Sequence, residues 1–122
     1  MRFDTVFLPE SHVLTIRVQG AGDVDTVPQM VAAIRSAPEF RPGMGVLIDA
    51  LSTDYAPSAQ DASTLPSFFD KHLPGSRLAV LVRDRGQYAI ASLVETLASR
   101  RDVPFAVFPD RAEAMHWLTA KP

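Results

Sequence analysis

Three apolar, strand-like runs of the chain end at or near an aspartate, and a helix-like stretch follows each of them. Residues 46–48 lead to Asp49, residues 78–82 lead through Arg83 to Asp84, and residues 105–108 lead to Asp110. Strands joined by helices in this way are typical of a parallel sheet, because each crossover must return the chain before the next strand can begin. The pattern therefore predicts an α/β fold, in which ligands bind at the carboxyl ends of the strands.

The remaining segments complete the predicted order of elements. Residues 3–8 and 13–18 flank Pro9-Glu10-Ser11 and predict an antiparallel hairpin. Apolar residues at helical spacing predict helices over about 27–34, about 58–73, around 90–97 and around 114–118. The sequence thus predicts a single α/β domain over residues 1–122, with the order ββαβαβαβα. Its five-stranded sheet is mostly parallel with an antiparallel N-terminal strand, and it carries four helices.

Composition excludes several classes of function. The 122 residues suit one domain, and the absence of cysteine excludes thiolate nucleophiles and cysteine-ligated metals. The net charge of −2 and the scattered basic residues argue against binding of nucleic acid. The three histidines do not have metal-ligand spacing, and no cofactor motif is present, so we predict neither a metal nor a cofactor. No apolar run reaches the ~20 residues of a membrane span, so we expect a cytoplasmic protein without membrane insertion.

Several stretches resemble the SpoIIAA-like, or STAS/SEC14-type, small bacterial domains. They are Pro38-Glu39-Phe40-Arg41-Pro42-Gly43, Val46-Leu47-Ile48-Asp49, Leu78-Ala79-Val80-Leu81-Val82, Tyr88 with Ala91, and the closing Val107-Phe108 to Ala114-Met115-His116-Trp117-Leu118. The resemblance covers nearly the whole chain and implies a SpoIIAA-like fold. Because none of these stretches is a catalytic signature, it implies a binding or regulatory module rather than an enzyme. The SEC14-type resemblance adds, by analogy, a lipid-like ligand.

The same resemblance raises the alternative of a phosphorylation switch. Related anti-sigma-factor antagonists are phosphorylated on a serine in a D-S-[ST]-G-like motif, at the start of the helix after the central strand. Ser58 falls at about that position in this sequence. Pro57 replaces the flanking acid and no glycine follows, so the motif is degraded and the phosphorylation switch is disfavoured.

Helix capping explains two of the three acids at strand ends. Asp84 with Gln87 and Asp110 with Glu113 have the spacing of a capping box, in which an acid at the helix start accepts hydrogen bonds from free amides. Ser58 begins a weaker version of the same pattern. We therefore interpret these three residues as helix caps first.

Asp49 has no helix to cap, because the next predicted helix begins only near Ser58. Its carboxylate must find the backbone amides of residues 50–55, an arginine or a ligand. The sequence predicts a ligand-binding site at this carboxyl edge of the sheet. Its candidate residues are Asp49, Ser52, Tyr55, Arg83, Asp84 and Tyr88, with Phe68 and Phe69 beside them.

Pro66 lies within the second predicted helix and should kink or restart it. Phe68 and Phe69 follow, and adjacent residues of a helix cannot face the same way. Phe69 fits the apolar stripe, while Phe68 lies at its flank. Both phenylalanines would fill the core, or a broken helix would use them to cover an apolar pocket or a partner surface.

We therefore expect a non-enzymatic module that binds a small amphipathic molecule or a protein partner. The alternative from another class is a small hydrolase or isomerase, with Asp49 as base and Arg83 as electrostatic stabiliser. A carboxylate free of partners and aimed into a cavity would favour that alternative. The N-terminal hairpin leaves an edge strand that could pair with a second copy, so we also expect a homodimer.

Overall fold

Each strand of the sheet lies beside its neighbours in sequence, in the order β1-β2-β3-β4-β5. The computed structural model describes residues 1–120. The strands are β1 (Arg2–Leu8), β2 (Val13–Gly20), β3 (Gly45–Thr53), β4 (Leu78–Leu81) and β5 (Phe105–Phe108). Only β1 and β2 pair antiparallel, and the other three pairs are parallel. The predicted α/β architecture, with its antiparallel N-terminal strand, is confirmed.

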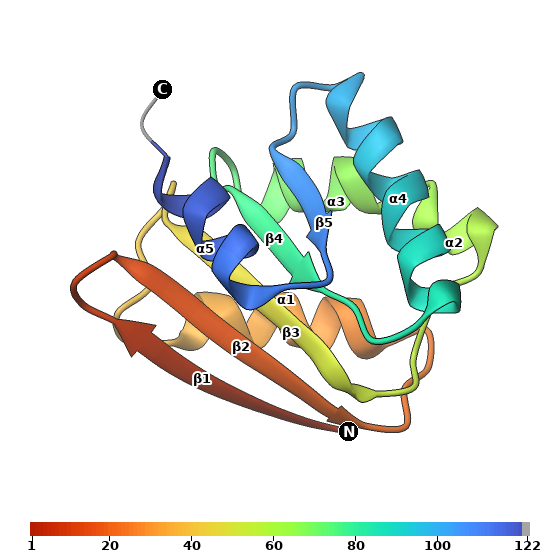
Figure 1. Ribbon diagram of the computed structural model, residues 1–122, viewed down its shortest axis with the longest axis horizontal. Coiled ribbons are helices and arrows are strands. Elements are labelled where there is room, and N and C mark those ends of the chain that lie inside the picture. Colours follow the sequence, from red (N-terminus) through yellow and green to blue (C-terminus); the bar gives the residue numbers. More distant parts are fainter. Residues whose placement is uncertain (121–122) are drawn as a thin grey trace.

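The helices cover the two faces of this sheet unequally. They are α1 (Thr26–Ser36), α2 (Ala59–Ala62), α3 (Leu65–His72), α4 (Arg85–Ser99) and α5 (Arg111–Thr119). Crossovers between parallel strands are almost always right-handed, so strands added one after another place their helices on one face. Accordingly α1, α3 and α4 lie on one side of the sheet and α5 alone covers the other (Figure 1).

The second predicted helix region is divided into α2 and α3. The hydroxyls of Ser63 and Thr64 donate to carbonyls of α2, Gln60 O at 2.6 Å and Asp61 O at 2.7 Å, and such bonds compete with continuation of a helix. Pro66 lies in the first turn of α3, where its missing N–H has no helical partner to lose. The helix therefore restarts at this proline, as predicted.

Two hydrophobic cores fill the space on the two faces, because successive residues of a strand point to opposite sides. In β3, Val46 and Ile48 join the larger core beneath α1, α3 and α4, while Leu47 joins the smaller core beneath α5. The smaller core consists of Val13, Leu47, Ala79, Leu81, Ala114 and Leu118. Asp49 follows the alternation of Leu47 and lies on the α5 side.

The prediction that the central strand ends at Asp49 is wrong. β3 continues to Thr53, and a bulge shifts its pairing with β2, so that Arg17 pairs with Asp49 but Gln19 pairs with Ser52. Because the bulge adds one residue to β3, the side chains after it point to the opposite side of the sheet from the one that simple alternation would give. Thr53 consequently lies on the side of the larger core, where its hydroxyl donates to Gly20 O at 2.6 Å.

Candidate functional site

Asp49 is buried, with 2% of its surface exposed, and protein groups hold its carboxylate. Oδ2 accepts a hydrogen bond from Nη2 of Arg111 at 2.8 Å and lies 3.6 Å from Nε of Arg17. Oδ1 accepts from the Leu51 amide at 3.0 Å. A buried carboxylate is stable when it is paired in this way. Both oxygens are occupied, so the geometry gives no support to Asp49 as a general base.

The two arginines that hold Asp49 could not be found from the sequence. The amides of residues 50–55 were the expected partners, and Leu51 does supply one of them. Arg17 comes from β2 and Arg111 from the first turn of α5, 62 residues away from Asp49. No hydrogen bond or ion pair joins Arg83 to Asp49 within the described part of the chain. Arg83 instead forms an ion pair with Asp84 at 3.5 Å.

The three predicted helix caps are confirmed. Asp84, Asp110 and Ser58 each accept a hydrogen bond from an amide in the first turn of the following helix, at 2.9, 3.3 and 3.0 Å respectively. The bond from the Gln87 amide is the main reason that the pKa of Asp84 lies below its ordinary value, and Arg83 adds to the effect. These acids therefore begin helices α4 and α5, and the serine begins α2.

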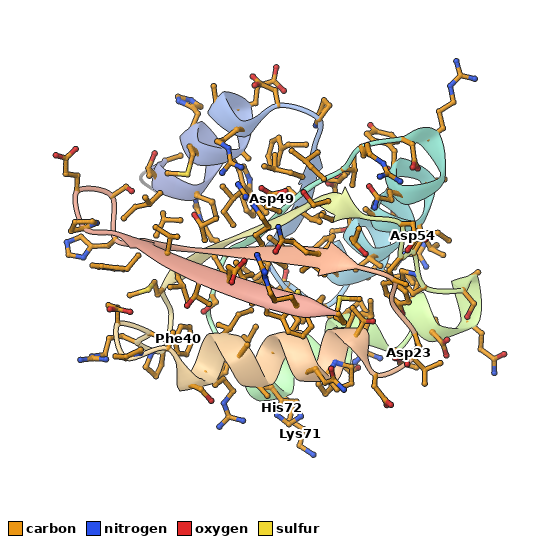
Figure 2. The ribbon with its side chains drawn as sticks, turned by 90° about the horizontal axis from the view of Figure 1, so that it is seen from below. Asp23, Phe40, Asp49, Asp54, Lys71 and His72 are labelled. Atoms are coloured by element: carbon orange, nitrogen blue, oxygen red, sulfur yellow. The ribbon has the colours of Figure 1, made fainter. Side chains whose placement is uncertain are left out.

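An apolar cavity of about 100 Å³ lies on the opposite side of the sheet from Asp49, beneath the carboxyl ends of β3 and β4. Ile48 and Val80 of the sheet, Met30 of α1, Phe69 of α3, and Ala91 and Val94 of α4 form much of its wall. The segment from Tyr55 to Pro57 also lines it. Figure 2 shows Asp49 on the α5 side of the sheet, and Lys71 and His72 of α3 beyond the other side.

Three of the four polar side chains in the cavity wall, those of Thr26, Thr53 and Gln87, have hydrogen-bond partners within the protein, and the fourth belongs to Tyr55. The hydroxyl of Thr26 accepts from the Asp23 amide at 2.9 Å, and that of Thr53 donates to Gly20 O at 2.6 Å. The side chain of Gln87 is bonded at both ends of its amide. A molecule in the cavity therefore meets mostly hydrocarbon, which favours a largely apolar occupant.

Gln87 fixes the rim of the cavity, although the sequence pattern indicated it only as the partner of the Asp84 cap and not as a site residue. Its side chain is buried, with 6% of the residue exposed. Nε2 donates to Ala50 O at 3.1 Å and to Thr53 O at 3.0 Å, while Oε1 accepts from the Arg83 amide at 2.7 Å. One side chain of α4 thus holds the ends of β3 and β4 together.

A second hollow, of about 380 Å³, lies outside the cavity between α1, α2 and α3. The cavity and this outer hollow share four wall residues, Val27, Tyr55, Pro57 and Leu65. The two adjacent phenylalanines line different hollows, since Phe69 lines the cavity and Phe68 lines the outer hollow. Phe69 also belongs to the larger core and Phe68 packs against that core, so both phenylalanines fill the interior as well as lining the hollows.

Tyr55 lines both the cavity and the outer hollow, and Gly22 leaves the space that its side chain occupies. A Cβ atom at Gly22 would lie 2.6 Å from Cβ of Tyr55 and 2.7 Å from the hydroxyl of Thr26. Burial raises the pKa of the Tyr55 phenol, and the charges of Asp61 and Asp23 raise it further. The phenol therefore stays neutral to a higher pH than an ordinary tyrosine does.

The structure divides the predicted site into two parts. Tyr55, Phe68 and Phe69 meet around the cavity and the outer hollow. Asp49 lies across the sheet, and Tyr88 is 49% exposed on α4. The residues that line neither hollow are Asp49, Ser52, Arg83, Asp84 and Tyr88.

Two further observations concern residues 1–120 as a whole. Within this range, no three or more His, Asp or Glu side chains are grouped so that they could hold a metal ion. None of the helices described is both long enough and apolar enough to cross a membrane.

Comparison with known proteins identifies the fold. No family model matches the sequence, and no curated protein is significantly similar to it. Among solved structures, the chain is similar to an uncharacterised protein of the DUF3478 family from Shewanella loihica PV-4, which has a SpoIIAA-like fold. The TM-score is 0.57 at 20% identity, over 96% of this chain and 92% of that chain. The fold of this protein is therefore SpoIIAA-like, as the resemblance predicted.

Proposed function

We propose that this protein is a binding module for a small, largely apolar molecule, which occupies the cavity beneath β3 and β4. The observation that carries the proposal is the chemistry of the wall. Apolar side chains form most of it, and the polar side chains of Thr26, Thr53 and Gln87 bond to other groups of the protein. Sites for small molecules are concave, mostly apolar and preformed, and they are common at this edge of α/β sheets.

The size of the two hollows sets the class of ligand. An apolar cavity of about 150 Å³ binds a benzene molecule, so the present cavity of about 100 Å³ takes a short hydrocarbon segment. The outer hollow has room for the rest of the ligand, and Asp61, Thr64 and Lys71 give it polar walls. A molecule with an apolar tail and a polar end suits this arrangement, with the tail passing Tyr55.

Two alternatives have less support. An enzyme that uses Asp49 as a base needs a carboxylate oxygen free to accept a proton, and both oxygens of Asp49 have partners. A phosphorylation switch at Ser58 stays a prediction. The residue is exposed and its Oγ accepts a capping hydrogen bond from the Asp61 amide at 3.0 Å.

A fluorescence titration with the uncharged dye N-phenylnaphthylamine tests the proposal. The dye brightens when it enters an apolar site, and the wild-type protein should bind it saturably. Ala91→Leu adds hydrocarbon to the cavity wall and should weaken binding about tenfold or more, because the cavity of about 100 Å³ takes only part of the dye and the leucine side chain would fill that space.

Ala89→Leu is the matched control, because Ala89 is exposed on the same helix. It should bind the dye as the wild type does. Circular dichroism of both variants establishes that they are folded. Equal affinity in the wild type and in folded Ala91→Leu, or no saturable binding in either, would overturn the proposal.

A further inference from the structure

We infer that β1 is a dimerisation edge, which pairs antiparallel with β1 of a second copy of this chain so that the two Thr5 residues lie opposite each other. β1 lies along the outer edge of the sheet (Figure 1). Its seven residues pair with β2 in an unbroken register from Arg2 to Leu8. The other side of such a strand presents a row of backbone amides and carbonyls that can accept a further strand.

The opposite edge of the sheet is protected, whereas β1 is not. β5 has only four residues, and the Glu95 side chain of α4 accepts a hydrogen bond from its Val107 amide at 2.7 Å. Short edges, covering helices and charged side chains are the devices that prevent association of strands. β1 has no proline and no bulge, and its two charged side chains, Arg2 and Asp4, neutralise each other at 3.2 Å.

The side chains of β1 select the register. A two-fold axis through Thr5, perpendicular to the sheet, pairs all seven residues of both strands. Phe3 then lies opposite Phe7 of the partner subunit, twice, and such aromatic pairs stabilise antiparallel strands. Asp4 lies opposite Val6 of the partner subunit, so no like charges meet. An axis through Asp4 would instead place the two aspartates opposite each other, which is unfavourable.

Burial in the single chain agrees with this arrangement. Val6 is 57% exposed, and Thr5 is exposed although Phe3 and Phe7, on the same face, pack against the larger core. A second strand beside β1 would cover Thr5 and Val6 and would extend the core across the two-fold axis. The partner that this surface fits best is therefore a second copy of the chain.

The absence of cysteine allows a direct test by disulfide trapping. In the predicted register the two copies of residue 5 are directly opposed, and directly opposed residues of antiparallel strands have Cα atoms ~4.5–5.5 Å apart, within disulfide range. Thr5→Cys should therefore form a disulfide-linked dimer rapidly under mild oxidation. Val6→Cys is the control, because its two copies are offset along the strands and should cross-link far more slowly.

Light scattering and native mass spectrometry of the unmodified chain complete the test and should report a dimer. Thr5→Arg places two like charges at the axis and should yield a folded monomer, as judged by circular dichroism. A monomeric wild-type chain would overturn the inference. It would also be overturned if Val6→Cys cross-linked as fast as Thr5→Cys, or if folded Thr5→Arg remained a dimer.

Discussion

Replacement of Gln87 by alanine tests whether one side chain holds the rim of the cavity. Gln87→Ala removes the acceptor of the Arg83 amide at 2.7 Å and the donor to the carbonyls of Ala50 and Thr53, at 3.1 and 3.0 Å. These backbone groups lie at the ends of β3 and β4, where the protein buries the Gln87 amide. The variant therefore leaves one buried carbonyl, that of Thr53, and two partly buried backbone groups without this partner.

The magnitude follows from these three hydrogen bonds. Each contributes about 1 kcal/mol net, and an orphaned buried group costs about 1–3 kcal/mol, so the free energy of unfolding should fall by about 3 kcal/mol. Domains of this size are stable by only about 5–15 kcal/mol. The expected loss therefore corresponds to a melting temperature lower by roughly 10 °C.

Urea unfolding, followed by circular dichroism, measures this loss as a lower midpoint with an unchanged slope. Gln29→Ala on α1 is the control, because Gln29 is exposed and its replacement should change stability by less than about 0.5 kcal/mol. The dye affinity of Gln87→Ala should also fall, since Ala50, Thr53 and Gln87 all line the cavity. A loss below about 1 kcal/mol would refute the role assigned to Gln87.

Three further predictions concern Gly22, the two arginines beside Asp49, and Tyr55. Gly22→Ala should lower the free energy of unfolding by about 1–3 kcal/mol, because its new Cβ meets Tyr55 at 2.6 Å, and an unchanged urea midpoint would contradict that packing. Arg111→Met should lower the free energy of unfolding by about 1–3 kcal/mol and Arg17→Met by much less, because Arg111 lies 2.8 Å from the Asp49 carboxylate and Arg17 lies 3.6 Å from it. Equal losses of the two variants in urea unfolding would contradict the stronger role of Arg111. The raised pKa of Tyr55 contributes stability below its ordinary value of 10.0, and this contribution is lost as the pH rises past that value. The urea midpoint should accordingly fall more steeply in alkaline solution for the wild type than for Tyr55→Phe, and parallel pH profiles would contradict this.

The fold could be predicted from the sequence because local patterns determine it. The alternation of strands, acids and helical stripes specified the order of elements, and Pro66 indicated where the second helix restarts. The end of the central strand was misplaced because a bulge carries β3 past Asp49 to Thr53. A bulge arises from pairing with the neighbouring strand, so the sequence of one strand alone does not reveal it.

The candidate site was only partly predictable, because tertiary packing creates it. The helical stripe predicted that Phe69 faces the apolar interior, and it belongs to the larger core and lines the cavity. The partners of Asp49 come from β2 and α5, and nothing in the residues around Asp49 indicates them. The cavity is a gap left between helices and sheet, so its existence depends on side-chain volumes and not on periodicity.

The central claim is that an apolar ligand enters the cavity between the sheet and helices α1, α3 and α4. Titration with octanoate, followed by methyl NMR, tests it most directly, because the two faces of the sheet carry separate sets of methyl groups. Methyl signals of Ile48 and Ile90, which line the cavity, should shift saturably, while those of Leu47 and Leu118 on the α5 side should not. Equal shifts on both faces, or shifts that leave Ile48 and Ile90 unchanged, would contradict the account.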